Sequence, residues 1–303
     1  MLKQILFLLF ISSNIWGHKM ENKYFTWSEF TDSFGKEMNS AVDVYESMKK
    51  NGLVDYSLAI LDFDFNSDNK ENLEKLKNFL IKTYSYSNLV IKKNDNDWEL
   101  SGETTEIPIT EETLLYWALD MYKKGYEFDS ILEGYGAPID HKTQRFPDFD
   151  KSKEDFYFDK AIDYYNSGNL STAFSYLCIV LKINPNDPNS YYSRAIVRNE
   201  LYTWKSALKD YDRAIELAPD FISAILNRGS LKDENGDYSG AILDYNTVIK
   251  ISKNDTKHLQ RAYFNRGNSK YNIKDKNGAC EDWQKAKELG ADYANERLNA
   301  YCK

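Results

Sequence analysis

The sequence predicts two domains, an α+β domain followed by an all-α solenoid of paired helices. Two observations in the 303 residues indicate this order. The second half repeats one pattern of small and aromatic residues, at spacings of 34, 34 and 38 residues set by four alanines: Ala173, Ala207, Ala241 and Ala279. The first half has no repeat and alternates strand-like with helix-like segments. An aperiodic stretch at 138–153, which contains Pro147, lies between the halves and is expected to be a linker.

Residues 1–17 have the pattern of an export signal. Lys3 precedes an unbroken apolar run at 5–11, and the segment 12–17 ends in Gly17 before His18. The run is too short to cross a bilayer, which takes a helix of about 20 residues. We therefore expect a signal peptide at 1–17, an exported protein that is periplasmic or secreted, and no membrane span in its mature form. The alternative is an apolar helix docked on the domain, in a cytoplasmic protein.

Helices and strands alternate between residues 18 and 137. The segment 18–51 is helical, with apolar residues three and four apart from Phe30 to Met48, and it ends at Asn51-Gly52. We then expect a strand at 58–65, a helix at 71–84, strands at 88–93 and 98–107, a helix from its Thr110 cap to Gly125, and a strand at 127–132. This β-α-β-β-α-β order predicts a ferredoxin-like fold over 52–137, with the helices on one face of an antiparallel sheet.

Part of this segment resembles the RraB family, the protein regulators of ribonuclease E activity. The resemblance rests on the strand at 58–65, the helix at 69–84 and two motifs, Tyr126-Glu127-Phe128-Asp129 and Glu133-Gly134-Tyr135-Gly136. It implies a non-catalytic α+β domain that acts by binding a protein, with Asp129, Glu133, Gly134, Tyr135 and Gly136 in its motif. The sequence departs from the family at Glu133, where Asp is more usual. The alternative for the two glycines is a tight exit turn at a sheet edge.

The four repeats resemble the tetratricopeptide repeat (TPR), a helix–turn–helix unit of about 34 residues. In repeat two, Tyr191 lies sixteen residues before the alanine, Ala195 twelve before it and Tyr211 four after it. Small residues let two helix axes approach closely, and one unit cannot bury its own apolar face, so units stack. We expect four TPR units at 154–289 and a capping helix at 290–303.

The TPR resemblance implies a partner groove on the first helices of the repeats. Its positions fall on Phe158, Ile162, Tyr165, Tyr192, Ile196, Asn199, Leu226, Asp233, Arg261, Phe264, Asn268 and Tyr271. The family's clamp for a terminal carboxylate is excluded, because Phe158 and Ile162 stand where it would begin. One apolar row instead suits a peptide or an amphipathic helix, namely Phe158, Tyr192, Leu226 and Phe264. The alternative is that this row packs against the linker or the neighbouring domain.

Charged residues recur in the repeats at fixed positions. Thirteen residues before the alanine stand Arg194, Arg228 and Arg266, and three after it stand Asp210, Asp244 and Asp282. Repeat one has Lys160 and Tyr176 there instead. The pattern predicts an ion pair between the two helices of one repeat, a scaffold feature that contributes about 0–1 kcal/mol if it is partly exposed. Carboxylates more than about 6 Å from their own arginines would contradict it.

Three cysteines are present. Cys178 is expected to be a buried small apolar residue of repeat one. In an oxidising compartment Cys280 and Cys302 can pair and hold the C-terminal helix in place. The alternative is two unrelated thiols.

The charges and motifs exclude several classes of function. Residues 1–153 carry 26 acidic and 18 basic side chains, which accounts for the whole net charge of −8. Such an acidic half argues against nucleic acid as a direct ligand and suits a basic protein partner. The run Asp62-x-Asp64-x-Asn66-x-Asp68 resembles a calcium loop but has Ser67 and Leu73 where that loop needs Gly and Glu. We expect no metal, no cofactor and no catalytic residues.

The sequence therefore predicts a non-enzymatic, exported adaptor that recruits protein partners through the TPR groove and the acidic RraB-like domain. The alternative is a protein regulator or inhibitor of a ribonuclease, cytoplasmic if residues 1–17 are retained.

Overall fold

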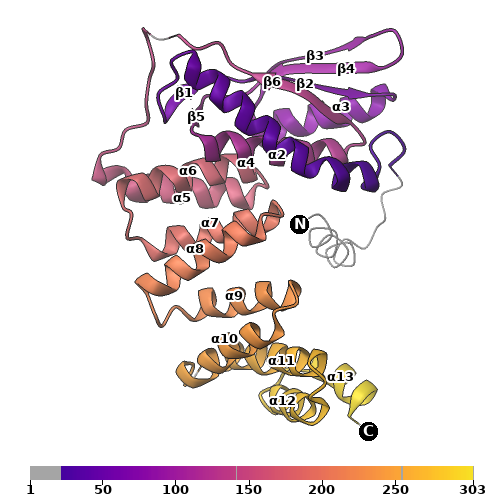
Figure 1. Ribbon diagram of the computed structural model, residues 1–303, viewed down its shortest axis with the longest axis vertical. Helices are drawn as coiled ribbons and strands as arrows, with labels where there is room; N and C mark the ends of the chain where they lie inside the picture. The colour runs from indigo at the N-terminus through magenta and orange to yellow at the C-terminus, as the bar shows by residue number, and fades with distance from the viewer. Residues whose placement is uncertain (1–21, 141, 254, 303) are drawn as a thin grey trace. The chain divides into compact units, whose positions relative to one another are not determined.

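The computed structural model describes residues 22–140, 142–253 and 255–302. The signal peptide predicted at 1–17 lies outside these residues. The chain divides into two compact units, Met1–Pro185 and Asn186–Lys303. Figure 1 shows strands and helices in the first unit and helices alone in the second. No helix in the described ranges is long and apolar enough to cross a membrane.

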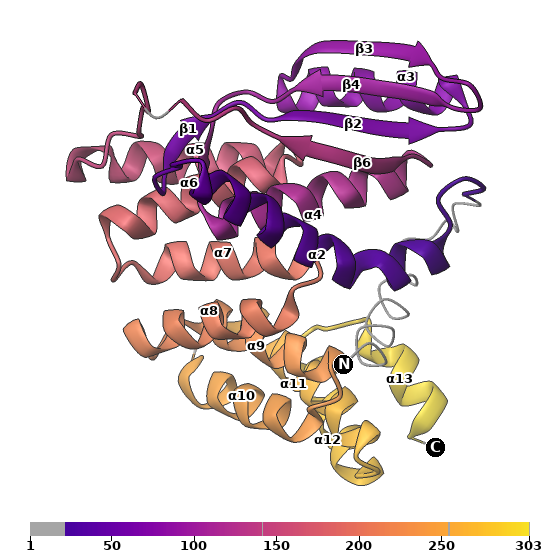
Figure 2. The same cartoon turned by 45° about the horizontal axis from the view of Figure 1, so that its top comes forward.

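The first unit is built on a four-stranded antiparallel sheet. Its strands are β2 (Asp62–Ser67), β3 (Ser87–Lys93), β4 (Trp98–Glu103) and β6 (Ile131–Gly136), in the order β3-β4-β2-β6 (Figure 2). A second sheet pairs β1 (Ser57–Ala59) with β5 (Ile107–Ile109). Because side chains alternate along a strand, Phe63, Phe65 and Leu100 point into the core while Asp62 and Asp64 lie on the opposite face.

Three helices complete this core. They are α2 (Trp27–Lys50), α3 (Lys70–Phe79), which continues into a π-helical turn at Leu80–Tyr84, and α4 (Glu111–Glu127). The helix α2 begins at a Thr26–Glu29 capping box, and Thr110 caps α4 as predicted. Residues of all three helices pack on the inner face of the sheet in one cluster, including Tyr45, Leu76 and Trp117. The unit is therefore α+β, with an antiparallel sheet.

Three of the predicted strands need correction. The single strand expected at 58–65 is two strands, β1 and β2, and that expected at 98–107 is β4 and β5. Both breaks fall where Leu61 and Thr104 lie opposite each other. The N–H of Leu61 donates to Thr104 Oγ1 at 2.8 Å, and the N–H of Thr104 donates to Leu61 O at 2.9 Å. The two paired segments therefore pass from one sheet to the other at the same point.

The third correction concerns the last strand, expected at 127–132. The helix α4 runs past Gly125 to Glu127, and Asp129 turns the chain with a positive φ of 50°. The strand β6 therefore starts only at Ile131. Gly134 and Gly136 lie within this strand, so the alternative of a tight exit turn at these glycines is wrong.

The first helix pair of the repeat region belongs to the first unit. After the short 3₁₀ turn η2 (Lys151–Lys153) come α5 (Glu154–Asn166) and α6 (Leu170–Ile183). Phe174 of α6 stacks on Tyr116 of α4, with ring centroids 3.9 Å apart. Asp120 of α4 is fully buried, and its Oδ2 accepts from the N–H of Ser171 at 2.8 Å. The compact unit ends at Pro185 because of these contacts, not at the linker 138–153.

The described residues of the second unit form three helix pairs and a last helix. The pairs are α7 (Pro188–Glu200) with α8 (Trp204–Leu217), α9 (Ile222–Glu234) with α10 (Tyr238–Ile251), and α11 (Thr256–Asn272) with α12 (Lys276–Glu288). The last helix is α13 (Ala294–Tyr301). A Cβ on Gly229 would lie 2.8 Å from the Tyr245 ring, and one on Gly267 2.6 Å from the Trp283 indole. The small residues thus stand where the paired helices touch, and the predicted all-helical repeat region is confirmed.

A candidate protein-binding face on the repeat helices

The first helices of the three pairs in the second unit lie side by side and are joined by hydrogen bonds. Asn227 Nδ2 of α9 donates to the Tyr192 hydroxyl of α7 at 3.2 Å. Asn265 Nδ2 of α11 donates to Ser230 Oγ of α9 at 3.3 Å, and Ser269 Oγ donates to Asp233 Oδ1 at 2.9 Å. We call the surface made by these helices the first-helix face; its residues are Tyr192, Ile196, Asn199, Asn227, Ser230, Asp233, Arg261, Phe264, Asn265, Asn268 and Tyr271.

Sequence reasoning did not single out Asn227 and Asn265. Both stand fourteen residues before the alanine of their own repeat, Ala241 or Ala279. That shared spacing was visible in the sequence, and it is the signal that could have found them. Both residues are half-buried, and the amide nitrogen of each donates to the preceding first helix.

Most predicted groove residues in the second unit are accessible, and one is not. Half-buried on the first-helix face are Tyr192, Ile196, Asn199, Asp233, Phe264, Asn268 and Tyr271, and Arg261 is exposed. Leu226 is fully buried among Ile225, Tyr245 and Val248. The predicted apolar row is therefore interrupted, because Leu226 fills the seam of its own helix pair and a guest would not reach it.

Phe158, Ile162 and Tyr165, the predicted groove residues of repeat one, lie on α5 in the first unit. All three are half-buried there.

Aromatic rings cover parts of the first-helix face from within the second unit. Tyr192 packs against Phe221, with centroids 4.9 Å apart. Phe264 meets Tyr293 edge-on at 4.7 Å, and Tyr271 lies 4.6 Å from Tyr301. Both tyrosines that contact α11 come from the C-terminal residues of the chain.

One carboxyl on this face has a strongly shifted pKa. Burial raises the pKa of Asp233 to about 6, although the hydrogen bond from Ser269 acts in the opposite direction. Its neighbour Glu234 also has a raised pKa, through burial and then through the charge of Asp233. Burial disfavours the charged form of this Asp, and a cationic group of a bound guest beside it would favour that form again.

The predicted ion pairs are confirmed and are more buried than expected. Arginine Nη2 lies 2.8, 2.5 and 2.6 Å from aspartate Oδ1 in the pairs Arg194–Asp210, Arg228–Asp244 and Arg266–Asp282, respectively. Each aspartate side chain is at most 5% exposed. A second cation one helical turn further on also contacts each carboxylate, namely Arg198, Lys232 or Lys270.

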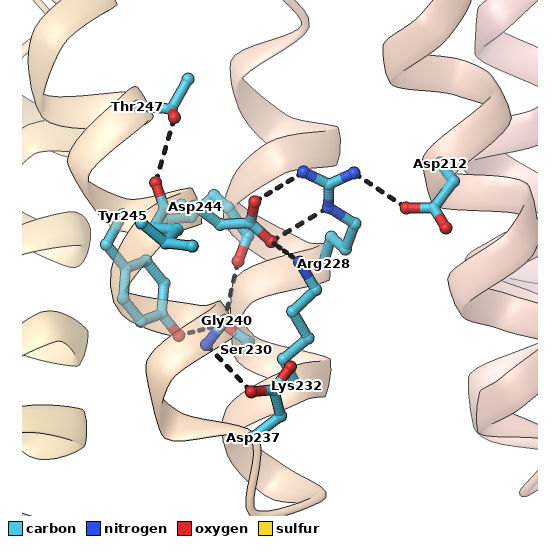
Figure 3. A network of polar contacts seen from close by, with 11 residues as sticks. Asp212, Arg228, Ser230, Lys232, Asp237, Gly240, Asp244, Tyr245 and Thr247 are labelled. Atoms are coloured by element: carbon cyan, nitrogen blue, oxygen red, sulfur yellow. Dashed lines mark hydrogen bonds and ion pairs between the residues drawn. The ribbon is translucent and has the colours of Figure 1, made fainter. Parts of the chain in front are cut away.

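Figure 3 shows the middle network. The Nε and Nη2 of Arg228 both donate to Asp244, and Lys232 Nζ contacts Asp244 Oδ2 at 2.9 Å. The remaining Nη1 donates at 2.8 Å to Asp212 of the preceding pair. One guanidinium therefore links α9 to α10 and to α8. This network fixes the spacing of the helices and takes no part in the first-helix face itself.

The residues on which the predicted RraB resemblance rests have structural roles in the first unit. Asp129 Oδ1 accepts from the N–H groups of Tyr24 and Phe25 at 2.9 Å each, and Oδ2 accepts from that of Lys23. The Tyr135 hydroxyl donates to Glu37 Oε1 at 3.0 Å, which ties β6 to α2. Asp129 and Tyr135 thus hold the N-terminal segment and α2 on the sheet.

The remaining motif residues lie at or near the outer face of the sheet, opposite the core. Glu133 is exposed there, and Gly134 leaves space for the Asp64 carboxylate, which a Cβ would approach to 3.2 Å. Gly136 lies beside a hollow of about 450 Å³ whose lining includes Asp62, Asp64 and Glu103. Burial, then the charges of Glu99 and Glu133, raises the pKa of Asp64.

The second unit contains the disulfide that the sequence left open. Cys280 of α12 and Cys302, which follows α13, are bonded, with Cα atoms 5.7 Å apart. Cys178 is buried in α6. In the described ranges no group of three or more His, Cys, Asp or Glu is placed to hold a metal ion.

Comparison with known proteins finds similarity to proteins with repeats of this kind. No family model matches the chain. Serine/threonine-protein phosphatase 5 of Rattus norvegicus is 31% identical over 98 residues, 32% of this chain and 19% of that protein. Hsp70-Hsp90 organizing protein 2 of Arabidopsis thaliana is 25% identical over 157 residues, 46% of this chain and 28% of that protein. The chain thus spans 19% and 28% of the length of these two relatives.

Solved structures show weaker likeness. "Crystal structure of YrrB: a TPR protein with an unusual peptide-binding site" aligns with a TM-score of 0.44 and 19% identity, over 60% of this chain and 82% of that one. "First TPR of Spaghetti (RPAP3) bound to HSP90 peptide SRMEEVD" aligns with a TM-score of 0.38 and 19% identity, over 41% of this chain and 95% of that one.

Proposed function

We propose that this chain, whose C-terminal half is built of tetratricopeptide repeats, is a non-enzymatic adaptor that holds a peptide segment of a protein partner on its first-helix face. One observation carries the proposal. The helices α7, α9 and α11 lie side by side, tied by asparagines at equivalent positions, and present half-buried amides, hydroxyls and aromatic rings along one surface.

The chemistry of this surface suits a peptide. Amide side chains donate to and accept from a peptide backbone, and aromatic rings pack against apolar side chains. Rows of equivalent residues on stacked first helices form the binding surface of a repeat solenoid. The name of the relative Hsp70-Hsp90 organizing protein 2 describes a protein that organises two others, and it matches 46% of this chain. Both points support an adaptor role.

The test is peptide selection followed by affinity measurement. The full chain is used to select binders from a displayed peptide library, and their affinities are measured by calorimetry for the parent chain and for the variant Asn227→Ala/Asn265→Ala. Loss of two hydrogen-bonding amides is expected to weaken binding about tenfold or more. The control is Leu243→Glu, a residue of α10 that is 67% exposed and outside the first-helix face.

Equal affinity of the parent and the double asparagine variant for every selected peptide would contradict the proposal, as would a loss in the Leu243 variant alone.

We further propose that the outer sheet face of the first unit attracts a basic segment of a partner protein. Five carboxylates lie on neighbouring positions of β2, β4 and β6, namely Asp62, Asp64, Glu99, Glu103 and Glu133. Like charges crowded on one face destabilise each other until a cationic partner neutralises them. A ferredoxin-like classification of this unit stays part of the proposal, supported by the strand order β3-β4-β2-β6.

Salt titration separates the two surfaces. Binding of a lysine-rich peptide to the parent chain should weaken steeply with salt, and Asp64→Asn/Glu133→Gln should remove most of that dependence. An unchanged salt dependence in this variant would rule out the acidic face as the site.

Export is also part of the proposal. The pattern at 1–17 and the disulfide between Cys280 and Cys302 support an oxidising compartment. Mass spectrometry of the mature protein from its native source is expected to show an N-terminus near His18. A retained Met1 would place the protein in the cytoplasm instead.

A further inference from the structure

The C-terminal residues 291–302 lie on two aromatic residues of the first-helix face. Tyr293 meets Phe264 edge-on at 4.7 Å, and Tyr301 lies against Tyr271 at 4.6 Å. We call residues 291–302 the latch segment. Phe264 and Tyr271 are the large aromatic side chains that α11 contributes to the first-helix face, so the latch segment packs on both rings, while Arg261 of the same helix stays exposed.

The helix within the latch segment is too short to be stable alone. The helix α13 has eight residues and no side-chain cap at its N-terminus, and isolated helices below about 12–15 residues are marginal in water. It follows Gly290, which has a φ of +92° and lets the chain turn back after α12. Its position therefore depends on docking against α11 and α12.

Two attachments hold it there. Ala291, Ala294, Leu298 and Tyr301 pack against Trp283 and Ala286 in one apolar cluster. The disulfide joins Cys302, at the end of α13, to Cys280 in α12 and closes a segment whose ends are 22 residues apart in sequence. The bond is thus placed at the end of the latch segment farthest from α12 along the chain, where fraying would otherwise begin.

We propose that the latch segment is an intramolecular occupant of the first-helix face, and that the Cys280–Cys302 disulfide decides whether a partner peptide can replace it. The inference rests on the proposed function of that face. In the oxidised chain, a guest competes with the latch segment for the rings of Phe264 and Tyr271, whereas, within the described ranges, Tyr192, Asn227 and Asn265 have no contact with that segment that would have to be displaced. When a dithiol reduces the bond, two electrons and two protons pass to the cysteines, the dithiol becomes a disulfide, and α13 detaches from the aromatic rings.

The first test needs no guest. Hydrogen exchange of the full chain is followed by mass spectrometry in three states: oxidised, reduced by a dithiol, and carrying Cys280→Ser/Cys302→Ser. Amides of the latch segment are expected to exchange at least about tenfold faster in the second and third states, because a docked end becomes free to open. The matched control is Cys178→Ser, which should leave this exchange unchanged. Equal latch-segment exchange in all three states overturns the inference.

The second test uses the peptides selected on the parent chain. Peptides that contact α11 are expected to bind the reduced chain and the double serine variant at least about tenfold more tightly than the oxidised chain. Reduction of the unmutated chain guards against misfolding of the variant, and circular dichroism confirms that helix content outside α13 is retained. Faster exchange with unchanged peptide affinity overturns the inference while the proposed function stands. No peptide binding in any state overturns the proposed function, and the exchange result then still reports whether the latch opens.

Discussion

At the scale of single residues, the buried aspartates of the repeats carry the clearest relation between sequence and structure. Asp210, Asp244 and Asp282 each accept from two cations on the first helix of their own pair. Repeat one keeps a cation, Lys160, at the arginine position but has tyrosines in place of the second cation and the aspartate. Tyr164 and Tyr176 occupy the positions of the second cation and the aspartate, and their rings stack at 5.4 Å. The contact between the helices is kept while its chemistry changes.

Removal of one of these aspartates should be costly. Asp244→Ala leaves Arg228 and Lys232, both largely buried, without their shared carboxylate. Breaking a buried pair in this way costs about 3–5 kcal/mol of unfolding free energy. Urea unfolding measures the loss.

The matched control for this prediction is Asp212→Ala, at the other end of the same guanidinium. Asp212 is 54% exposed, so its removal should cost about 1 kcal/mol or less. Equal losses in the two variants would show that burial does not set the strength of the network.

The raised pKa of Asp233 makes a prediction about pH. This carboxyl titrates near 3.8 when unfolded and at about 6 in the folded chain, so the folded state binds the proton more tightly. Stability therefore falls as pH rises from about 4 to about 6, which is opposite to the usual behaviour of a salt-bridged Asp. Asp233→Asn should have a higher Tm than the parent at pH 7.5. At pH 4.5, where the parent carboxyl is largely protonated, the two Tm values should differ less.

Thermal unfolding at the two pH values measures this effect. The exposed loop residue Asp220, changed to Asn, is the control and should alter the pH dependence little. If the Tm of the parent and that of Asp233→Asn change equally between the two pH values, the raised pKa of Asp233 is contradicted.

At the scale of elements, periodicity predicted the helices well and the strand ends poorly. The repeat helices follow from residues that must be small where two axes touch, as Gly229 and Gly267 show. The α4 cap at Thr110 follows from local chemistry. The division of 58–65 and 98–107 into four strands does not, because alternation alone cannot show where two paired strands leave one sheet for another. The Asn227 and Asn265 contacts were also missed: their shared spacing before the repeat alanines marks the two positions, but the partners that they contact follow from the packing of successive first helices.

The junction between α4 and α6 was likewise invisible in the sequence, and it yields a prediction. Asp120 Oδ2 accepts from the N–H of Ser171, in the first turn of α6, and from the Tyr84 hydroxyl at 2.9 Å. Asp120→Ala leaves these buried donors unsatisfied, which should cost about 1–3 kcal/mol. The loss should appear in urea unfolding, together with faster hydrogen exchange at the start of α6.

An exposed aspartate of α5 serves as the comparison. Asp163→Ala should change the unfolding free energy by no more than about 0.5 kcal/mol. Unchanged exchange in α6 after loss of Asp120 would mean that this carboxylate does not position the helix.

At the scale of the whole molecule, the division into units differs from the division into sequence patterns. The repeat pattern begins at residue 154, yet the first helix pair packs on α4 and shares a compact unit with the sheet. A chain that ends at Lys153 would expose Tyr116, which is 2% accessible in the intact unit, and would deprive Asp120 of its contact with Ser171. Exposure of one such aromatic side chain costs about 1.5–3 kcal/mol.

We therefore predict that residues 22–185 unfold in one cooperative urea transition, whereas residues 22–153 are less stable by about 2–4 kcal/mol and bind a dye for apolar surface. The control is Tyr116→Ala in the longer chain, which removes the same ring contact and should reproduce part of the loss in stability seen in the shorter chain. If residues 22–153 match 22–185 in stability, the stack of Phe174 on Tyr116 adds nothing, and the α+β segment is a folding unit without the first repeat. If residues 22–153 are less stable as expected, the first helix pair stabilises the α+β segment. The dependence is mutual, because a lone helix pair cannot bury its own apolar face.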